Sequence, residues 1–389
     1  MNALFCHDGP TYVDENKQYY ACVLTDEMIE RYFSFCTHFT LLNRVNHISL
    51  EQGKSFEKIN HKQVDIISIP NLATLKGIIF NRKKAKKIIE GQVKKADCII
   101  ARLPGFAGTY ALQYAIKYHK RYFVEMVGCP FDALWNHSLK GKLMAIPMFI
   151  VTKYFMRKSK NTIYVSNRFL QNRYPSSGNV LGCSDVEIYI EEGMPEKRKL
   201  KIENTNFKHA ILGTMGTLNM RYKGFDTVIK CLSNLNKKGY QLQYVVMGAG
   251  DKTWLEHMIK KYHAEDFVTI HKPVAHSKVF DWIDQDIDIY IQPSRTEGMP
   301  RALIEAMSRA CPSIGSDAGG IPELLEEKYI FHKGSYKELM KLLTALLSDK
   351  EQIQTLSEKC FQASEEFDYE KLRQKREKFY QKVIKDENE

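Results

Sequence analysis

The sequence lacks the cysteine pattern of a secreted or zinc-binding protein. Its nine cysteines are scattered, form no Cys-x-x-Cys pair and have no histidine at zinc-ligand spacing. This pattern indicates reduced core thiols of a cytosolic protein rather than disulfides or metal ligands. Glycine and proline are also sparse, with 22 and 12 residues among 389, and this excludes a collagen-like or low-complexity chain.

Long hydrophobic runs are absent as well. The first apolar run, Ala3–Cys6, is shorter than the ~7–15 residues of a signal-peptide core, and no basic residues precede it. The longest apolar stretch, Leu143–Met156, is interrupted by Pro147 and Lys153 and falls short of the ~20 residues of a membrane-spanning helix. We therefore expect no targeting signal and no membrane span, which leaves contact with a membrane surface open.

What the sequence does contain is a regular alternation of short apolar runs and amphipathic segments. Its length predicts roughly two to three domains at ~150 residues per domain, and 44% hydrophobic and 26% charged residues are typical of globular proteins. Such alternation predicts βαβ units and a parallel sheet covered on both faces. In the first half, the predicted strands are Ala3–Cys6, Val64–Ile69, Cys98–Ala101, Tyr122–Val127 and Thr162–Val165, and the predicted helices include Leu75–Val93 and Ala107–Lys117.

The alternation stops and then restarts in the second half of the chain. Residues 191–208 are polar with little periodicity, as expected of an interdomain linker. The second series has predicted strands at His209–Gly213, Leu242–Met247, Phe267–Ile270 and Ile287–Ile291, and a predicted helix at Gly224–Asn236. We therefore expect an α/β protein with an N-terminal domain (1–190), a linker (191–208) and a C-terminal domain (209–368). The last segment, 369–389, is predicted to be a charged helix that packs back on the N-terminal domain.

Positive charge is concentrated in the first half. The net charge is +11, and residues 1–200 contain 29 basic and 18 acidic residues, whereas residues 201–389 contain 28 of each. Such a field attracts acidic lipids, phosphate-bearing substrates or nucleic acid. The densest cluster, Arg82–Lys87, is interpreted either as a solvated helix face or as a contact for an anionic membrane or acceptor. Nucleic acid is disfavoured because the aromatic residues lie in apolar runs, where core positions explain them better than exposed stacking platforms do.

The most informative stretch surrounds the boundary between a strand and a helix in the second half. A buried strand is predicted to end at Pro293, and a helix is predicted to begin with Pro300, where a missing N–H has no cost. Gly298 allows the sharp turn between them. The free amides of Arg301 and Ala302 then lie at a positive helix end, which suits a phosphate group.

Two glutamates mark this helix. Glu297 lies just before it, and Glu305 follows eight residues later, about 12 Å of rise if all eight residues were helical. Carboxylates at this spacing could hold hydroxyl groups at the two ends of one extended polar ligand. They are too far apart to act as a general acid and base on one bond.

Glu297-x7-Glu305 followed by Ser316-Asp-Ala-Gly319-Gly320-Ile-Pro322-Glu323 closely resembles family 4 of the retaining glycosyltransferases. The resemblance implies the GT-B fold, in which two Rossmann-like domains face each other across a cleft and the C-terminal domain holds most of the nucleotide-sugar donor. Asp284-Gln-Asp286-Ile-Asp288 imitates the D-x-D that binds metal in another glycosyltransferase fold, but it leads directly into the apolar strand at Ile289, so a helix end and a strand start explain it. We therefore expect no metal and no cofactor. A weaker similarity links Arg102-Leu-Pro104, Phe123–Gly128 and Tyr164-Val-Ser166 to a branch that builds bacterial capsular or exopolysaccharide chains.

The resemblance assigns roles around the helix start. Glu297 would contact hydroxyl groups of the donor sugar, and Glu305 would contact the ribose. The backbone from Gly298 through Met299 and Pro300 to Arg301 would meet the sugar and the diphosphate.

A second motif, Gly216–Gly224, supplies cations after the first strand of the C-terminal domain. Lys223 lies at the start of the next helix, where it can neutralise a diphosphate. Family members carry an arginine directly after the first glycine, but this chain has Thr217 there. Arg221 is the candidate that replaces it. Gly248 resembles the family's next glycine turn, and on its own it is equally well explained as the end of a strand.

Candidates in the N-terminal half are less sharply defined. Gly9 follows the first strand and would let backbone amides approach the donor phosphates, whereas His7 and Asp8 are explained equally well as turn residues. Family members often carry a histidine after the strand matched by Phe123–Val127, but this chain has Gly-Cys-Pro there. The candidates on the acceptor side are therefore Asp132, His137, Ser166 and Asn167.

We accordingly predict a retaining glycosyltransferase that moves a hexose from a nucleotide-sugar donor to a glycan. The expected acceptor is lipid-linked, and the enzyme is expected to be cytoplasmic and peripheral at the inner face of the cell membrane, through Lys83, Lys84, Lys86, Lys87 and Leu143–Met156. One alternative is a nucleotide-sugar hydrolase or epimerase of the same fold. An alternative of another class is a basic nucleic-acid-binding protein.

Overall fold

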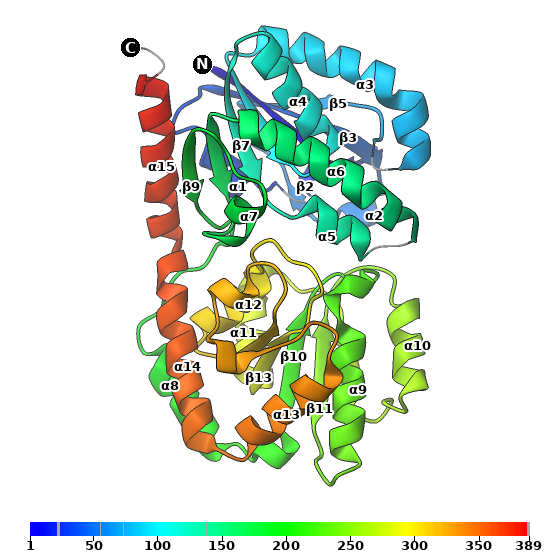
Figure 1. Ribbon diagram of the computed structural model, residues 1–389, viewed down its shortest axis with the longest axis vertical. Coiled ribbons are helices and arrows are strands. Elements are labelled where there is room, and N and C mark those ends of the chain that lie inside the picture. Colours follow the sequence, from blue (N-terminus) through cyan, green and yellow to red (C-terminus); the bar gives the residue numbers. More distant parts are fainter. Residues whose placement is uncertain (22–23, 55, 73, 137–138, 387–389) are drawn as a thin grey trace. The chain divides into compact units, whose positions relative to one another are not determined.

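The computed structural model describes residues 1–21, 24–54, 56–72, 74–136 and 139–386 (Figure 1). Contacts divide the chain into two compact units, each built on its own sheet. Unit 1 comprises residues 1–128, 149–183 and 373–389, and unit 2 comprises residues 129–148 and 184–372. The C-terminal segment thus contributes to the same unit as the first strands.

The sheet of unit 1 has a parallel core in the order β5-β3-β1-β6-β7-β8-β9, as expected for buried apolar strands joined by helices. Two short strands, β2 and β4, extend it in antiparallel fashion from β1. The strands are β1 (Asn2–Val13), β2 (Tyr19–Ala21), β3 (His38–His47), β4 (Glu57–Lys58), β5 (Val64–Ser68), β6 (Cys98–Leu103), β7 (Arg121–Met126), β8 (Asn161–Tyr164) and β9 (Asn179–Gly182).

The first strand is longer than the sequence predicted. β1 does not end at Cys6, because its pairing with β3 resumes at Pro10 after a shift in register between those two residues. The segment with Gly9 is therefore a bulge within one strand rather than a loop after it. β3 itself was not predicted, since His38, Asn43 and Arg44 interrupt its apolar pattern.

Helices cover this sheet (Figure 1). Near the C-terminus, the ring of Tyr380 packs against Phe35, Phe123 and Tyr32, with centroids 4.7, 4.9 and 6.3 Å away. The helices of unit 1 are α1 (Asp26–Glu30), α2 (Leu50–Gly53), α3 (Leu75–Lys95), α4 (Phe106–Lys117), α7 (Phe169–Arg173) and most of α15 (Tyr369–Asp386). The boundary between the two units falls within α6 (Leu139–Lys158).

Unit 2 contains a six-stranded, entirely parallel sheet in the order β12-β11-β10-β13-β14-β15. Its strands are β10 (Ile211–Met215), β11 (Gln243–Met247), β12 (Val268–His271), β13 (Ile289–Gln292), β14 (Ser313–Ser316) and β15 (Ile330–Phe331). Its helices are α5 (Pro130–Trp135), α8 (Met194–Asn204), α9 (Phe225–Asn236), α10 (Thr253–Lys261), α11 (His276–Asp286), α12 (Arg301–Ser308), α13 (Tyr336–Leu347) and α14 (Lys350–Ser364). Because β10 lies between β11 and β13, the loops that follow these strands meet at one edge of the sheet.

The segment 191–208 is not an irregular connection. It contains helix α8, in which Met194, Arg198 and Ile202 are buried. The Arg198 guanidinium donates hydrogen bonds to the carbonyl oxygens of Ile287 at 2.7 Å and Ile283 at 3.1 Å. The sequence concealed this helix because an arginine occupies one of its few buried positions.

Two expectations from composition concern thiols and membrane spans. The cysteines that the structure describes are all buried and form no disulfide with one another. Among the described residues, no helix combines the length and the low polarity that crossing a membrane requires.

Candidate active site

The loops after β10 and β13 bring a lysine and a glutamate together in unit 2. The Nζ of Lys223 lies 2.7 Å from Oε1 of Glu297, and only 19% and 11% of the two side chains are exposed. The same Oε1 atom accepts hydrogen bonds from the hydroxyl of Ser294 at 2.7 Å and the side-chain amide of Gln292 at 3.0 Å. All three donors thus converge on one oxygen, and none of the described residues donates to Oε2.

A series of buried hydrogen bonds holds Glu297 in this position. Gln292 and Tyr290 are on β13, and the Tyr290 hydroxyl donates to Oε1 of Gln292 at 3.1 Å. The Tyr290 hydroxyl in turn accepts the backbone N–H of Met215, the last residue of β10, at 3.1 Å. These side chains are at most 1% exposed, and their direct hydrogen bonds link the two strands beneath Glu297.

The pair carries charge. Burial alone would lower the pKa of Lys223, but the neighbouring Glu297 carboxylate more than offsets this effect and the pKa is raised. Lys223 is therefore protonated at neutral pH and supplies a fixed ammonium to the site.

Two glycines allow the loops to lie this close together. A Cβ atom on Gly224 would lie 2.0 Å from the carbonyl oxygen of Pro293, and the residue has a φ of +78°. A Cβ atom on Gly248, at the end of β11, would lie 1.8 Å from the carbonyl oxygen of Gly216. A side chain on Gly224 would push apart the loops that carry Lys223 and Glu297, and one on Gly248 would push the loop after β11 away from the loop that carries Lys223.

The glycine pair of the later motif supports the backbone beside Glu297. The N–H of Gly320 donates to the carbonyl oxygen of Gly298 at 2.9 Å. A Cβ atom on Gly319, whose φ is +60°, would lie 2.2 Å from the Glu297 carbonyl oxygen. The motif around Glu297 and the Gly319-Gly320 motif are thus in direct contact, although about twenty residues separate them in the sequence.

Helix α12 begins one residue later than predicted. Pro300 is its N-cap with φ −77° and ψ 100°, and Arg301 is its first residue. The expectation that Pro300 opens the helix is corrected, because its carbonyl oxygen already accepts the N–H groups of Leu303 and Ile304. Among the described residues, no side chain caps this end. The first N–H groups of α12 therefore have no capping side chain in the described part of the chain, and the binding of an anion there stays a prediction.

Glu305 lies on the fifth position of α12 and has a partner that the sequence did not indicate. The Nε2 of His276, at the start of α11, lies 3.5 Å from Oε1 of Glu305. Hydrogen bonding to Glu305 raises the pKa of His276, against the opposing effect of burial.

Two other predicted donor-side residues, Arg221 and Thr217, lie in the loop that carries Lys223. Arg221 is exposed, and its guanidinium lies over the ring of Trp254, 5.7 Å from the centroid. Thr217 is exposed in the same loop, and Met299 is buried. Arg221 thus belongs to the 3-10 turn that ends at Lys223, but its side chain contacts α10.

Sequence reasoning missed five polar residues of this site: Tyr290, Gln292, Ser294, Arg295 and His276. Gln292 left one signal, because it is polar within a strand that is otherwise apolar. Arg295 lies inside the motif around Glu297, but it contacts Arg221 and Tyr222 in the loop after β10. Nothing in the sequence pairs His276 with Glu305.

In unit 1, the bulge of β1 places polar residues at the carboxyl edge of the sheet. The Gly9 N–H donates to Nδ1 of His7 at 3.0 Å. Asp8 accepts the backbone N–H groups of Phe106 at 2.5 Å and Ala107 at 2.7 Å, so it caps helix α4. Burial raises the pKa of Asp8, although these N–H groups favour its charged form.

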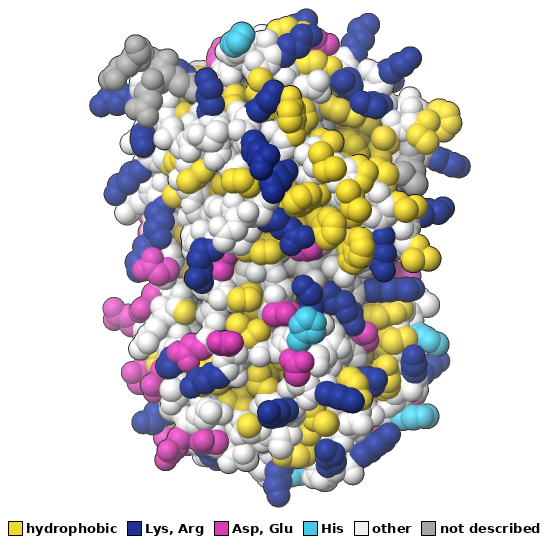
Figure 2. All heavy atoms as spheres, in the orientation of Figure 1, with side chains coloured by type: hydrophobic (Ala, Val, Ile, Leu, Met, Phe, Trp, Pro, Cys, Tyr) yellow, Lys and Arg dark blue, Asp and Glu magenta, His cyan; other side chains and the backbone are white. Residues whose placement is uncertain are grey.

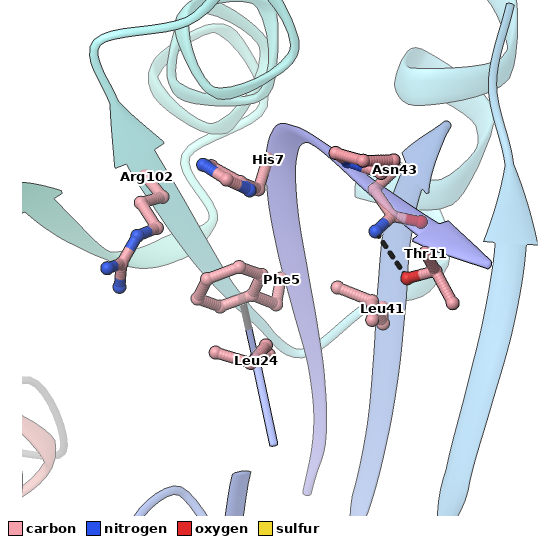
Figure 3. A pocket seen from close by; sticks show the side chains of 8 residues that line it. Phe5, His7, Thr11, Leu24, Leu41, Asn43 and Arg102 are labelled. Carbon is pink, nitrogen blue, oxygen red and sulfur yellow. Dashed lines mark hydrogen bonds between the residues drawn. The ribbon is translucent and has the colours of Figure 1, made fainter. Parts of the chain in front are cut away.

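A small pocket lies beneath this bulge (Figure 3). His7 and Arg102 lie at one end of it, and Phe5 lies between them and Leu24. The side-chain amide of Asn43 donates to the Thr11 hydroxyl at 2.7 Å within it. The pocket has room for about one water molecule, so it does not accommodate a sugar as it stands.

The acceptor-side candidates lie in different surroundings. Asp132 is half-buried in the first turn of α5, where its N–H donates to Sγ of Cys129 at 3.4 Å. The buried Ser166 hydroxyl accepts the N–H of Leu170 at 3.0 Å, a contact that shapes the turn before α7. Asn167 is exposed, and His137 lies outside the described residues.

Acidic residues near the strand start at Ile289 are used in ion pairs. Asp284 contacts the guanidinium of Arg309, and Oδ1 of Asp288 lies 3.5 Å from Nζ of Lys201. Within the described part of the chain, no group of three or more His, Cys, Asp or Glu residues is arranged to hold a metal ion.

The chemistry available in unit 2 is therefore the recognition of an anion with attached hydroxyl groups. Lys223 and the start of α12 offer positive charge, while Glu297 and Glu305 offer acceptors for hydroxyl groups on either side.

Sequence comparisons match this site to a known family. The family described as "Glycosyl transferases group 1" matches residues 196–363, which include Lys223, Glu297 and Glu305. Protein CapJ of Staphylococcus aureus is 30% identical over 356 residues, which are 90% of this chain and 88% of the relative. The amylovoran biosynthesis glycosyltransferase AmsK of Erwinia amylovora is 28% identical over 178 residues, 43% of each chain.

Structural comparisons extend the similarity over both units. Sucrose-phosphate synthase of Thermosynechococcus elongatus matches with a TM-score of 0.72 at 14% identity, over 98% of each chain. HepE of Anabaena in complex with UDP-glucose matches with a TM-score of 0.64 at 15% identity, over 98% of this chain and all of its own. These similarities confirm the predicted α/β architecture with two Rossmann-like domains. The chain therefore belongs to the group 1 glycosyltransferases (family 4) and has the GT-B fold.

Proposed function

We propose that this protein transfers a hexose from a uridine diphosphate sugar, held by unit 2, to a glycan acceptor with retention at the anomeric carbon. The observation that carries the proposal is the ion pair of Lys223 and Glu297 beside the uncapped start of α12. The relative HepE was crystallised with UDP-glucose, which supports a uridine donor.

The donor diphosphate would lie between Lys223 and the first amides of α12. Departure of the nucleoside diphosphate builds negative charge on its oxygens, and a fixed ammonium and helix dipole stabilise that charge without reorganising. Arg221 would add a second cation once it leaves Trp254. The remaining donor contacts would come from Gly9, Gly216, Thr217, Gly248, Gly298, Met299, Pro300 and Arg301.

The two glutamates would orient the sugar and the ribose. Glu297 uses only Oε1 for its three protein contacts, so Oε2 is available to a donor hydroxyl. Glu305 would accept a ribose hydroxyl in place of its contact with His276. We assign no covalent nucleophile, and the chemistry depends on holding donor and acceptor in line.

The acceptor would be a growing cell-surface polysaccharide. Two relatives support this class: AmsK, named for amylovoran biosynthesis, and WcaL of Escherichia coli, 32% identical over 111 residues and named as a putative colanic acid biosynthesis glycosyltransferase. Asp132 and the exposed Asn167 remain the candidates for contact with it, together with His137, whereas the Ser166 hydroxyl is used in its own turn.

A lipid-linked acceptor requires access to a membrane, and helix α6 has a surface suited to one. Five apolar side chains lie along one face at helical spacing, each more than half exposed: Leu139, Leu143, Ile146, Ile150 and Tyr154. The opposite face buries Ala145, Thr152 and Met156. Figure 2 shows hydrophobic side chains gathered over this helix with Lys and Arg side chains around them.

Helix α6 is thus apolar on its exposed face as well as on its buried face, and it carries Lys142, Lys153 and Arg157. Such a helix fits the interface of an anionic bilayer. We therefore place the enzyme at the cytoplasmic face of the membrane. Of the basic cluster on α3, Lys83, Lys84 and Lys87 are exposed and suit the same surface. Lys86 lies over the rings of Tyr110 and Tyr114, at 5.1 and 5.8 Å.

The test combines binding and product analysis. Thermal stabilisation by UDP, but not by uridine at the same concentration, is expected, because ligands that bind only the folded state raise apparent stability. Radiolabelled UDP-hexoses are then incubated with and without lipid-linked glycan. Labelled glycan that forms only with acceptor supports transfer, whereas free labelled sugar formed equally in both reactions would show a hydrolase. Glu297→Gln is expected to abolish transfer, and transfer that survives it would place the site elsewhere.

A further inference from the structure

Arg295 lies in the loop after β13, two residues before Glu297, and reaches the loop after β10. Its backbone N–H donates to the carbonyl oxygen of Tyr222 at 2.6 Å. Its Nη1 atom donates to the carbonyl oxygen of Arg221 at 2.9 Å, and its Nη2 atom contacts the Asp226 carboxylate at 2.8 Å. One residue therefore makes three polar contacts with a loop about seventy positions away in the sequence.

These contacts lie on both sides of Lys223. Arg221 precedes it in the 3-10 turn, and Asp226 follows it in the first turn of α9. Nη2 of Arg295 also lies 3.3 Å from the hydroxyl of Thr227. Since a 3-10 turn of three residues has little stability of its own, the position of Lys223 depends on what holds the turn.

The contacts require the geometry of a guanidinium group. Arginine presents several N–H donors in a planar fork, and here they serve a carbonyl, a carboxylate and a hydroxyl at once. A lysine has one terminal nitrogen and cannot reproduce the fork. The second carboxylate oxygen of Asp226 is buried and accepts no hydrogen bond from the described residues, so Arg295 provides the main compensation for this charge.

We infer that Arg295 is a positioning residue, which acts on the donor through Lys223 and does not touch the donor itself. It couples the loop that carries the ammonium to the loop that carries Glu297. The inference rests on the proposed function, since it assumes that Lys223 meets a diphosphate. Without Arg295, donor binding would have to order the loop, and that entropic cost would weaken binding of the diphosphate.

The experiment compares the variant Arg295→Lys with a matched control, Arg309→Lys. Arg309 is also an ion-paired arginine of unit 2, with contacts to Asp284 and Glu191, and has no contact with the loops of the donor site. Dissociation constants are measured for UDP by calorimetry and for uridine by NMR titration. UDP carries the diphosphate and uridine does not, so their difference isolates the effect that passes through Lys223.

Arg295→Lys is expected to weaken the binding of UDP about tenfold, because charge-assisted hydrogen bonds that order the loop are lost. The binding of uridine is expected to weaken less than about twofold. Arg309→Lys is expected to change neither. In a Lys223→Ala background, Arg295→Lys is expected to add no further loss of UDP affinity. Three results would overturn the inference even if the wild type binds UDP. Arg295→Lys could weaken the binding of UDP and of uridine equally, or Arg309→Lys could lose as much UDP affinity as Arg295→Lys. The third is an additive loss of UDP affinity when Arg295→Lys is combined with Lys223→Ala. Failure of the wild-type protein to bind UDP more tightly than uridine would overturn the proposed function as well.

Discussion

The Nζ of Lys223 and Oε1 of Glu297 lie 2.7 Å apart across two loops that follow adjacent parallel strands. The pair joins positions separated by 74 residues, and it has a buried foundation of Gln292 and Ser294. In the proposed reaction, a cation held in this way would meet the leaving diphosphate without first having to be ordered.

Replacing Lys223 by alanine is expected to lower kcat/KM for transfer by about 10²–10³-fold, because one fixed donor to the developing charge is lost. Glu297 keeps its contacts with Gln292 and Ser294, so the fold is expected to persist. Steady-state kinetics with the donor are the measurement. Lys230→Ala is the control, since Lys230 lies on α9 over the ring of Tyr336, at 4.0 Å, and outside the site. Equal losses in both variants would argue against a role for Lys223 in catalysis.

The close approach of Gly224 to Pro293 predicts a steric penalty that can be separated from backbone strain. Gly224→Ala introduces a Cβ atom 2.0 Å from the Pro293 carbonyl oxygen at a φ of +78°. The control is Gly239→Ala, where φ is +95° and nothing lies within 4 Å of the added atom. The control is expected to lose about 1–2 kcal/mol of unfolding free energy from strain alone.

Gly224→Ala is expected to lose clearly more and to raise the KM for the donor, since the loops that hold Lys223 and Glu297 must separate. Urea unfolding and donor kinetics measure the two effects. If Gly224→Ala behaved as Gly239→Ala does in both measurements, the close packing of these loops would be irrelevant to donor binding.

The contact between His276 and Glu305 predicts a pH-dependent contribution to stability. Because the folded state raises the pKa of His276, mainly through its hydrogen bond to Glu305, the contribution is fully present below the ordinary value near 6.5. It is lost as the pH rises through the raised value. The difference in Tm between wild type and His276→Gln is therefore expected to be larger at pH 5.5 than at pH 8.5.

His209→Gln is the control for replacing a histidine as such, since His209 is exposed and lies outside the site. A His276→Gln difference that stayed constant or grew with pH would contradict the ion pair.

The exposed face of α6 predicts binding to anionic vesicles through apolar contacts. Leu143 lies on that face and is 79% exposed. Leu143→Glu is expected to lower the partition coefficient about tenfold or more, because burial of a leucine side chain contributes roughly 1.5–3 kcal/mol. Co-sedimentation with vesicles that contain phosphatidylglycerol is the measurement.

Leu200→Glu is the matched control, since Leu200 is also exposed, at 61%, but lies on α8. It is expected to leave partitioning unchanged. Increasing salt is expected to weaken binding of the wild type, because lysines around α6 contribute through screened charges. Binding that is insensitive to Leu143→Glu would remove α6 as the contact.

Local patterns in the sequence determined the architecture and one side of the site. Apolar runs flanked by turn residues predict strands, and their alternation with helical periodicity predicts two parallel sheets, because a strand buried on both faces must be apolar throughout. The motif around Glu297 and Glu305 identified the family for the same reason, since its residues are close together in the chain. The helix at Pro300 was placed to within one residue.

Tertiary structure alone decided which residues face one another across loops. The order of strands in the sheet places β10 beside β13, and this brings Lys223 to Glu297 and Arg295 to Asp226. No periodicity reports such contacts, because each loop is locally compatible with many positions. The same limit hid helix α8, where a buried arginine resembles a surface residue, and the two faces of α6, whose exposed apolar side chains resemble core residues until the rest of the fold leaves them uncovered.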